Sequence, residues 1–333
     1  MVVPVQLPFA ELHAALKAAG EGTRLRVLAL IAEAELTVSD LTEILRQSQP
    51  RISRHLRLLV DAGLIERYRE GNWAFFRIAE LGGAATVARD LIARLDPADP
   101  VIVRDRERLA EVRSARAAAA QAYFRQHAAE WDRIRRLHVA DEAVEAAIAK
   151  ALAARPFRSL LDLGTGTGRI LELFGPELER GLGIDLSLDM LAVARARLER
   201  AGLRHCSVRQ GDIYDLAVPR DSFDVVVIHQ VLHYLDDGAR AIREAARVLR
   251  PDGRLLVVDF APHELEFLRE EHAHRRLGFA GEAVAQWMTA AGLEVMSHIN
   301  LPPEPGSDGR IAVSLWLARD PRIAFAGTAR EVA

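Results

Sequence analysis

The feature that most constrains this chain is an apolar run that leads straight into a cluster of glycines. Ser159 to Leu163 precede Gly164-Thr-Gly-Thr-Gly168, and a helical pattern then continues through Phe174. Glycines at such a turn let backbone amides approach a bound ligand closely, because no side chain stands in the way. A strand, a ligand-binding turn and a helix are therefore predicted here. A tight turn without a ligand has the same pattern.

The rest of the C-terminal half extends this pattern. From Arg158 onward apolar strands alternate with amphipathic helices, which is typical of a parallel sheet with crossover helices. We expect seven strands, at residues 159–163, 181–185, 207–210, 223–229, 254–259, 294–299 and 312–317. The last two have no helix between them, so they should form an antiparallel pair at a sheet edge. The predicted fold class is α/β and Rossmann-like, with a seven-stranded, mostly parallel sheet.

Three acidic residues stand at the carboxyl ends of the first three predicted strands. Asp162 precedes the glycines, Asp185 ends the second strand and Asp212 ends the third. At the second position a carboxylate can accept hydrogen bonds from both hydroxyls of a ribose. Asp212 can accept from the exocyclic amine of adenine while Ile213 packs on the ring. Each acid alone also fits a helix cap or a loop, but three at the carboxyl ends of successive strands favour a nucleoside site.

Residues 158 to 318 resemble the class I S-adenosylmethionine-dependent methyltransferases. The resemblance implies S-adenosylmethionine or S-adenosylhomocysteine as ligand, bound by Asp162, Gly164, Thr165, Gly166, Asp185, Leu186, Met190, Asp212, Ile213 and His229. Asp162 and Gly164 would hold the methionine part, and Asp185 the ribose. Leu186 and Met190 would contact the face of the adenine, and Asp212 with Ile213 its edge. The turn Leu249-Arg-Pro-Asp-Gly253 also resembles this family.

Residues upstream of the sheet resemble the cover that small-molecule methyltransferases of the ubiquinone-biosynthesis type place over the cofactor. They are Tyr123-Phe124 and Trp131-Asp132. Aromatic residues on an amphipathic helix also fit an ordinary core.

Two histidines at the end of the fourth strand are the candidate catalytic bases. Methyl transfer needs alignment, and many acceptors also need a base to remove a proton. His229 and His233 share a face if that stretch is helical. Alternatively they line the cofactor site or cap a helix. His263, His272 and His274 have poor spacing for a metal site, so we predict none. The Asn-Pro-Pro-Tyr signature of DNA amine methylation is absent.

The N-terminal region reads as short helices followed by a hairpin of strands at 64–69 and 73–78. Ser48 is a good N-cap and Pro50 suits the first turn of a helix. In that helix Ile52, Leu56 and Leu59 should face the core, which leaves the arginines toward solvent. Seven Arg stand against three acids between residues 46 and 77, and such an excess favours phosphate contacts.

Residues 7 to 95 resemble the winged-helix ArsR/SmtB repressors, through the Ser-Gln-Pro start of the recognition helix and the Arg-Glu-Gly-Asn-Trp wing. The resemblance implies base readout by Gln49, Arg51, Ser53, Arg54 and His55, and backbone contacts by Arg67, Arg69 and Arg77. It also implies a homodimer interface made by helices 7–19 and 81–95. A winged helix used only for protein contacts is the alternative.

One departure from that family concerns its sensor. Metal-sensing members carry Cys-Val-Cys where this chain has Thr37-Val-Ser39. Hydroxyls are poor ligands for soft metals, so metal sensing of the usual kind is not expected.

Length and composition frame the domains. At 333 residues with half of them hydrophobic, the chain should form two domains. We expect a DNA-binding and dimerisation domain at 1–95, a linker and helical cover at 96–157, a methyltransferase-fold domain at 158–320 and a tail at 321–333. Helices are predicted at 104–136 and 141–154. The single Cys206, the net charge of -3 and the lack of a signal or membrane segment predict a cytoplasmic protein.

These patterns together predict a repressor-like transcription regulator that binds operator DNA. Its fused domain would bind S-adenosylmethionine or S-adenosylhomocysteine as effector, and methionine-cycle genes are suitable targets. The alternative is an active methyltransferase that acts on a small-molecule acceptor and carries its own DNA-binding domain.

Overall fold

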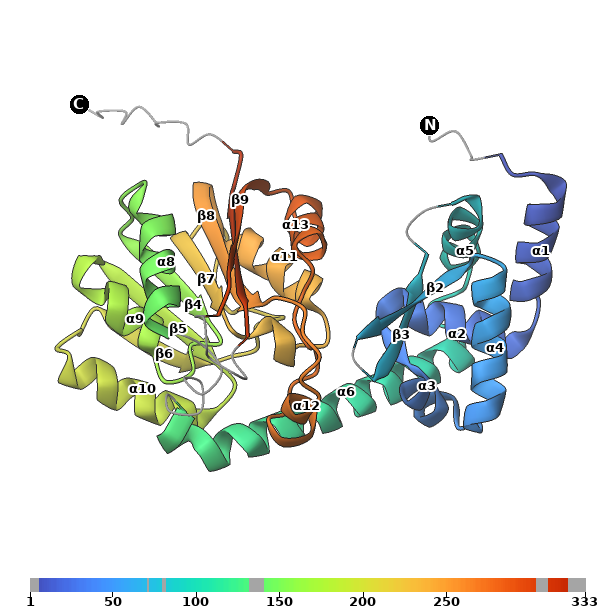
Figure 1. Cartoon of the computed structure of the whole chain (residues 1–333), viewed down its shortest axis with the longest axis horizontal. Helices are drawn as coiled ribbons and strands as arrows, with labels where there is room; N and C mark the ends of the chain where they lie inside the picture. The colour runs from blue at the N-terminus through green and yellow to red at the C-terminus, as the bar shows by residue number, and fades with distance from the viewer. Residues whose placement is uncertain (1–5, 71, 80–81, 132–140, 304–310, 323–333) are drawn as a thin grey trace. The chain divides into compact units, whose positions relative to one another are not determined.

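The computed structural model describes residues 6–70, 72–79, 82–131, 141–303 and 311–322, and these form two compact units, 1–119 and 120–333. Each unit is described by itself (Figure 1). The division lies within one long helix, α6 (Pro100–His127). The domain boundaries expected from the sequence therefore stay predictions. Asp132, residues 132–136 of the predicted long helix and most of the predicted tail lie outside the described residues.

The first unit is a helical domain with a small antiparallel sheet. Its elements are α1 (Phe9–Ala19), α2 (Gly22–Glu33), β1 (Leu36–Thr37), α3 (Val38–Leu45), α4 (Gln49–Asp61), β2 (Ile65–Glu70), β3 (Trp73–Ile78) and α5 (Gly83–Ala93). The strands pair in the order β1-β3-β2, and Glu70 lies opposite Trp73. The predicted hairpin is confirmed.

Local sequence explains the two central helices of this unit. Thr37 caps α3 in a capping box, in which its Oγ1 accepts from the amide of Asp40 while the Asp40 carboxylate accepts from the amide of Thr37. Helix α4 begins after Ser48 with proline in its first turn, although the Ser48 side chain makes no cap hydrogen bond. Its apolar side chains Ile52, Leu56 and Leu59 are buried in the core, as predicted.

Helix α6 extends this core. It begins at Pro100, directly after the Pro- and Asp-containing segment, rather than at Arg104. Leu109 and Val112 are buried with the apolar residues of the other helices. Asp105 is 2 % exposed, and its two carboxylate oxygens each accept a 2.6 Å hydrogen bond from the Arg26 guanidinium. The first part of α6 is therefore a structural element of the first unit.

The second unit is an α/β sandwich, which confirms the predicted fold class. Its sheet contains β4 (Ser159–Leu163), β5 (Arg180–Asp185), β6 (Cys206–Gln210), β7 (Phe223–His229), β8 (Leu249–Phe260), β9 (Glu294–Leu301) and β10 (Val313–Arg319). The strand order is β6-β5-β4-β7-β8-β10-β9. Strands β4 to β8 are parallel, and β10 is antiparallel to both of its neighbours.

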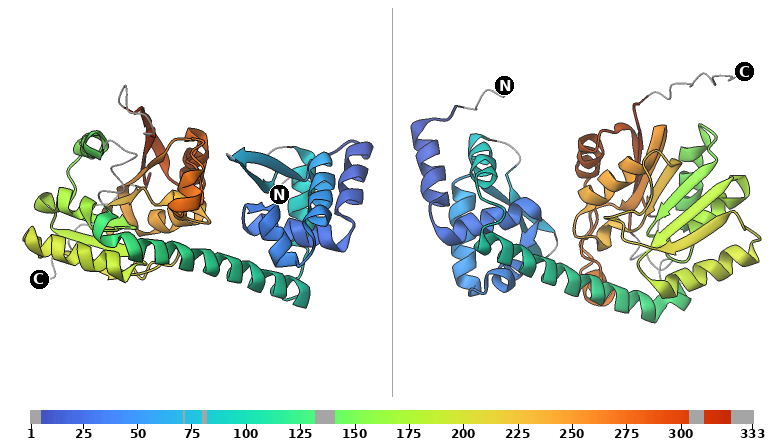
Figure 2. Two further views of the ribbon diagram at one scale, coloured as in Figure 1. Left: turned by 60° about the horizontal axis from the view of Figure 1, so that its bottom comes forward. Right: turned by 180° about the vertical axis from the view of Figure 1, so that it is seen from behind.

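Helices cover both faces of this sheet (Figures 1 and 2). One core contains apolar residues of α8 (Asp141–Ala153), α9 (Arg169–Phe174) and α10 (Leu188–Arg200), and the other those of α11 (Gly238–Val248) and α13 (Gly281–Ala290). Along β4, Leu160 belongs to the first core and Leu161 to the second. Because side chains alternate along a strand, a continuous apolar run is what a sheet buried on both faces requires.

One detail differs from the predicted sheet. The strand expected at 254–259 begins at Leu249, because Leu249 already pairs with Phe223 before a register shift near the turn. The predicted antiparallel pair at a sheet edge is confirmed: it consists of β9 and β10, with β9 outermost and β10 between it and β8. Within the described ranges, no helix is both long and apolar enough to cross a membrane.

The buried ion pair of α6 gives a stability test. Asp105→Ala should lower the free energy of unfolding of the first unit by about 3 kcal/mol, because it leaves the half-buried Arg26 without its partner. The neighbouring Arg106→Ala removes an exposed pair with Glu33 and should cost under about 1 kcal/mol. Amide hydrogen exchange in α2 measures both. Equal effects of the two substitutions would contradict this account.

Candidate functional sites

The glycine loop after β4 is held in a left-handed conformation. Gly164, Gly166 and Gly168 have φ angles of 71°, 52° and 80°, which other residues rarely adopt. The amides of Gly164 and Thr165 donate to the carbonyl of Ile184 on β5, at 2.8 and 3.0 Å. A Cβ atom on Gly164 would lie 2.4 Å from a methyl group of Val231. Glycine is therefore required here for conformation and for space.

Two of the predicted acids are tied to this loop. Asp162 is buried and accepts a 2.6 Å hydrogen bond from the Thr165 hydroxyl. The carboxylate of Asp185 accepts from the amides of Gly166 at 2.9 Å and Ser187 at 2.8 Å. Burial raises the pKa of Asp185, and these amide hydrogen bonds oppose the rise. Its two oxygens keep unused lone pairs, so the carboxylate can still accept bonds from a ligand.

The remaining predicted cofactor residues lie along the same edge. Asp212 is exposed and accepts a 2.8 Å bond from the Tyr214 amide, while Ile213 is buried beside it. Met190 is buried, and Leu186 is 39 % exposed although it is apolar. Since β4, β5 and β6 are neighbouring parallel strands, their carboxyl ends meet. The structure thus gathers carboxylates, a glycine loop and an exposed apolar side chain, a set that fits a nucleoside with a charged extension.

The two candidate bases do not share a helical face. His229 is the last residue of β7 and is partly buried, whereas His233 lies in a short 3-10 turn, Leu232–Tyr234. His233 is 1 % exposed, and its Nδ1 lies 2.8 Å from a carboxylate oxygen of Asp259. Asp259, at the end of β8, is fully buried. A histidine oriented by a carboxylate is an arrangement that suits proton transfer.

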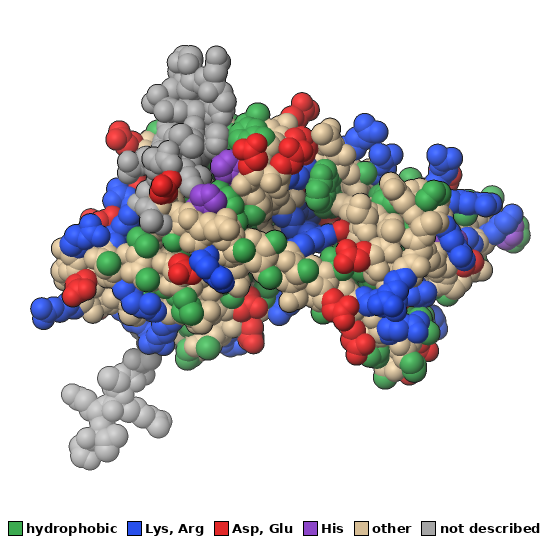
Figure 3. All heavy atoms as spheres, turned by 90° about the horizontal axis from the view of Figure 1, so that it is seen from below, with side chains coloured by type: hydrophobic (Ala, Val, Ile, Leu, Met, Phe, Trp, Pro, Cys, Tyr) green, Lys and Arg blue, Asp and Glu red, His purple; other side chains and the backbone are tan. Residues whose placement is uncertain are grey.

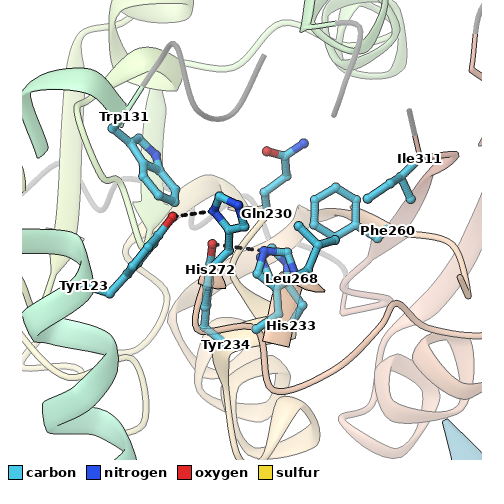
Figure 4. A pocket seen from close by; sticks show the side chains of 10 residues that line it. Tyr123, Trp131, Gln230, His233, Tyr234, Phe260, Leu268, His272 and Ile311 are labelled. Atoms are coloured by element: carbon cyan, nitrogen blue, oxygen red, sulfur yellow. Dashed lines mark hydrogen bonds between the residues drawn. The ribbon is translucent and has the colours of Figure 1, made fainter. Parts of the chain in front are cut away.

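His233 lines a small cavity of about 30 Å³, room for one or two waters. The side chains that line the cavity are drawn in Figure 4. The lining side chains are those of Tyr123, Trp131, Gln230, His233, Tyr234, Phe260, Leu268, His272, His274 and Ile311. His229 does not line it. Tyr123 Oη lies 2.6 Å from Nδ1 of His272, which joins the end of α6 to the residue that follows α12 (Phe267–Glu271).

Burial keeps two phenols that line the cavity, and one imidazole near it, in their neutral forms. Burial raises the pKa of Tyr123 to about 12 and that of Tyr234 well above its usual range, so both phenols stay protonated. Burial also lowers the pKa of the nearby His263 to about 4, which keeps that imidazole neutral. The aromatic residues predicted as a cofactor cover, Tyr123, Phe124 and Trp131, form an edge-to-face cluster at this cavity.

In the first unit, α4 presents a basic and polar face. Gln49, Arg51, Ser53 and Arg54 are exposed, as is Arg57. Basic side chains stand out from the surface of this unit in Figure 3. The exposed polar side chains of α4 thus face solvent, while Ile52, Leu56 and Leu59 face the core, as predicted.

His55 does not agree with the prediction that it reads bases. It is 9 % exposed, and its Nδ1 lies 3.5 Å from a carboxylate oxygen of Glu21. Burial lowers the pKa of His55; Glu21 opposes this, and the neighbouring Arg51 and Arg54 add to it. The residue sits on the core side of α4 because it follows Ile52 by three positions, close to one helical turn.

The predicted backbone-contacting arginines are of two kinds. Arg67 and Arg69 on β2 are exposed. Arg77 on β3 is half-buried; its Nε donates a 2.5 Å hydrogen bond to Glu66, and its guanidinium lies over the ring of Tyr68. The structure therefore leaves Arg67 and Arg69 accessible and holds Arg77 within the sheet.

Two family models match the chain. Residues 21–67 match the arsR family of bacterial regulatory proteins, and residues 161–257 match a methyltransferase domain. The chain therefore joins an ArsR-family helix-turn-helix domain to a class I methyltransferase domain. The first match runs from the start of α2 into β2, and the second runs from within β4, through the glycine loop, into β8.

Several curated relatives match part of the chain. An uncharacterized methyltransferase, YcgJ of Bacillus subtilis, is 34 % identical over 34 % of this chain and 46 % of its own length. A 37.1 kDa protein of a Streptomyces fradiae transposon is 35 % identical over 44 % of this chain and 46 % of its own. The ubiquinone/menaquinone biosynthesis C-methyltransferase UbiE of Vibrio parahaemolyticus is 35 % identical over 40 % of this chain and 54 % of its own length. The chain thus spans about half the length of these relatives.

A solved structure of a Thermotoga maritima S-adenosylmethionine-dependent methyltransferase is also similar. It has a TM-score of 0.49 and 22 % identity, and the match covers 60 % of this chain and 99 % of that one.

Sequence reasoning missed Gln230 and Asp259. Gln230 is a non-glycine residue with a positive φ of 55°, which a sequence does not reveal. Asp259 ends a strand and lies 26 residues from His233, so no local spacing connects them. The only available signal was that both follow apolar runs at the carboxyl ends of strands.

The glycine loop supplies a matched pair of substitutions. Gly164→Ala should weaken binding of S-adenosylhomocysteine about tenfold or more, because the new methyl group collides with Val231 and moves the loop. Gly202→Ala introduces the same left-handed strain, at a φ of 70°, into open space and should leave the affinity unchanged. Isothermal titration calorimetry measures both. Unchanged affinity in Gly164→Ala would show that the loop does not contact the ligand.

Proposed function

We propose that this protein is a DNA-binding transcription regulator whose methyltransferase domain binds S-adenosylmethionine or S-adenosylhomocysteine as effector. The observation that carries the proposal is helix α6. Arg116 of α6 pairs with Asp40 in the capping box of α3, while Tyr123 of the same helix bonds His272 in the methyltransferase unit. A single helix therefore carries contacts to both functional parts.

The DNA-binding part of the proposal rests on α4. Arg51, Arg54 and Arg57 are exposed and have no ion-pair partner among the residues that the structure describes. Arginines that reach phosphates release counterions, which supplies affinity that falls with salt. Gln49 and Ser53 on the same helix supply the polar side chains that base readout needs.

The sensing part rests on what replaces the metal ligands. Thr37, which occupies a thiolate position of the metal-sensing relatives, caps α3 instead. Asp40, its partner in that cap, is 3 % exposed and bonded to Arg116. A displacement of α6 would therefore act on the first helix of the helix-turn-helix. Such coupling requires that the ligand bind one state of the protein better than another.

The ligand assignment rests on the edge formed by β4, β5 and β6. We assign Asp185 to the ribose hydroxyls, and Asp212 with Ile213 to the adenine. The methyltransferase-domain match supports this assignment, as does a Mycolicibacterium smegmatis relative named as a probable S-adenosylmethionine-dependent methyltransferase, which is 34 % identical over 41 % of this chain. Control of methionine-cycle genes is consistent with such an effector, because those genes set its concentration.

A homodimer also belongs to this proposal, as does a cytoplasmic location. Phe9, Leu12 and Leu16 on α1 are 85 %, 38 % and 47 % exposed, a spacing that gathers them on one face of the helix. An apolar face of this kind is costly to leave in water and supports an interface made by α1 and α5.

Effector control is tested by DNA affinity. A duplex selected from a random pool by the ligand-free protein should change affinity at least tenfold when S-adenosylmethionine or S-adenosylhomocysteine is added, measured by fluorescence anisotropy. Arg116→Ala should keep the ligand affinity but lose the response, since it separates α6 from Asp40. Arg106→Ala, on the same helix with an exposed partner, is the control. If neither ligand changes the affinity of the unmodified protein, the effector proposal is wrong.

The arginine face makes a second prediction. Arg54→Ala should weaken binding to every duplex by a similar factor and reduce the slope of log affinity against log salt by about one. Arg104→Ala removes an exposed arginine of α6 and should change neither quantity. Titrations at four salt concentrations decide the matter. A slope that stays the same in Arg54→Ala would remove α4 from the DNA interface.

A further inference from the structure

Gln230 is held in an unusual conformation beside the glycine loop. It follows β7 and has a φ of 55°, and its backbone N–H donates a 2.7 Å hydrogen bond to the carbonyl of Val258. The residue is 8 % exposed, and its side-chain nitrogen is buried without a hydrogen-bond partner in the described part of the chain. A strained residue with an unsatisfied buried donor is costly, and both features concentrate at functional sites.

The partner of that donor must lie in the cavity that Gln230 lines (Figure 4). Val231, the next residue, packs against Gly164. Trp131, which also lines the cavity, has its Nε1 3.8 Å from where a Cβ of Gly166 would be. The cavity therefore lies next to the glycine loop, where the reactive part of the proposed cofactor would be bound.

His233 offers the complementary group. Its backbone amide, its Nδ1 and the amide of Phe260 all face the carboxylate of Asp259, at 3.4, 2.8 and 2.8 Å. A carboxylate only accepts hydrogen bonds, so Nδ1 carries a proton, and in the neutral imidazole Nε2 keeps its lone pair. Among the polar side chains that line the cavity, Gln230 thus supplies a donor and His233 a basic nitrogen.

A hydroxyl group satisfies both at once. Its oxygen accepts from the Gln230 amide while its hydrogen is donated to Nε2 of His233. The oxygen and nitrogen of the Gln230 side chain can exchange places by rotation. A hydroxyl pairs with either, because a hydroxyl both donates and accepts. The rings of Trp131, Tyr234 and Phe260 supply flat apolar walls, which favour a planar carbon skeleton.

We propose that this cavity is a methyl-acceptor subsite for a hydroxyl on a planar unsaturated carbon, a phenol or an enol, with His233 as base and Asp259 as its positioning residue. The inference rests on the proposed binding of S-adenosylmethionine in the neighbouring site and adds a catalytic activity to the regulator. Because the cavity is small, Tyr123 and Trp131 must move for a ring to enter. The hydrogen bond between Tyr123 and His272 joins this side of the cavity to the residue that follows α12.

The reaction balances without a further reagent. S-adenosylmethionine, when bound, supplies an electrophilic methyl group on a sulfonium. His233 takes the hydroxyl proton on Nε2, and the Gln230 amide stabilises the charge that develops on oxygen. A carbon–oxygen bond forms to the methyl group as its bond to sulfur breaks, which leaves S-adenosylhomocysteine. The proton on His233 then passes to solvent.

The test uses 4-nitrophenol as probe, because its absorbance reports whether it is ionised. The full-length protein saturated with S-adenosylhomocysteine should bind it and raise its ionised fraction at least threefold at a pH below the probe's own pKa. This readout needs no turnover. Labelled methyl transfer from S-adenosylmethionine to the same probe is measured in parallel.

Three variants separate the roles. Gln230→Leu should weaken probe binding about tenfold and reduce the ionised fraction. His233→Gln should abolish the ionisation and methyl transfer while changing probe affinity less than threefold. Gln286→Leu, an exposed glutamine on α13, is the matched control and should change nothing. Retained affinity for S-adenosylhomocysteine in each variant shows that the fold is intact.

The outcomes distinguish this inference from the effector proposal. If S-adenosylhomocysteine binds but the probe does not, the cavity holds only structural water and the acceptor subsite is refuted. If the probe binds and ionises equally in Gln230→Leu and His233→Gln, it binds elsewhere and the assignment is wrong. If S-adenosylhomocysteine itself does not bind, the effector proposal and this inference are refuted together.

Discussion

The left-handed turn that follows β4 is the constraint on which the methyltransferase unit depends. Three glycines with positive φ reverse the chain within five residues, and the turn is fixed by amide hydrogen bonds to Ile184 and to the Asp185 carboxylate. Neighbouring glycines make room for it: a Cβ on Gly183 would lie 2.6 Å from the Thr165 hydroxyl. The loop can lie against β5 because Gly183 has no side chain, and the parallel pairing of β4 with β5 brings Asp162 and Asp185 to the same edge of the sheet. The ligand site is thus a consequence of how the turn packs.

The alternation of apolar strands and amphipathic helices was enough to predict this sheet, because a parallel sheet covered on both faces needs continuous apolar strands. What the sequence did not contain is pairing between distant strands. The insertion of β10 between β8 and β9 depends on side-chain fit across residues far apart, such as Trp316, which is fully buried and stacks on His298. The role of α6 was also hidden. Its composition indicates a long helix, but the burial of Leu109 and Val112 and the pairing of Asp105 with Arg26 are what assign its first part to the first unit.

The candidate site residues show the same division. Glycines and acids at strand ends follow local rules, so their common edge could be predicted. His55 was assigned to base readout although its spacing of three positions from Ile52 puts it on the core side of α4, and its contact with Glu21, the N-cap residue of α2, is known only from the tertiary structure. The resemblance to the ArsR/SmtB repressors implied a backbone contact for Arg77, and its cross-strand partner Glu66 could be identified only once the register was known. Gln230 and Asp259 required the tertiary structure, because one is defined by backbone strain and the other by a partner 26 residues away.

The two proposals have a joint consequence. A regulator that binds S-adenosylmethionine and S-adenosylhomocysteine in one site responds to the ligand that occupies it. The size of the response is set by the difference between that ligand's affinities for the two states of the protein. Methyl transfer converts the first ligand into the second in place. If Gln230 and His233 bind a hydroxyl acceptor, then the presence of that acceptor changes which ligand α6 responds to, without any change in the ligands outside. Binding of the acceptor in the cavity would then also act on α6. Because the cavity is small, an acceptor that enters it must displace Tyr123, which is itself a residue of α6.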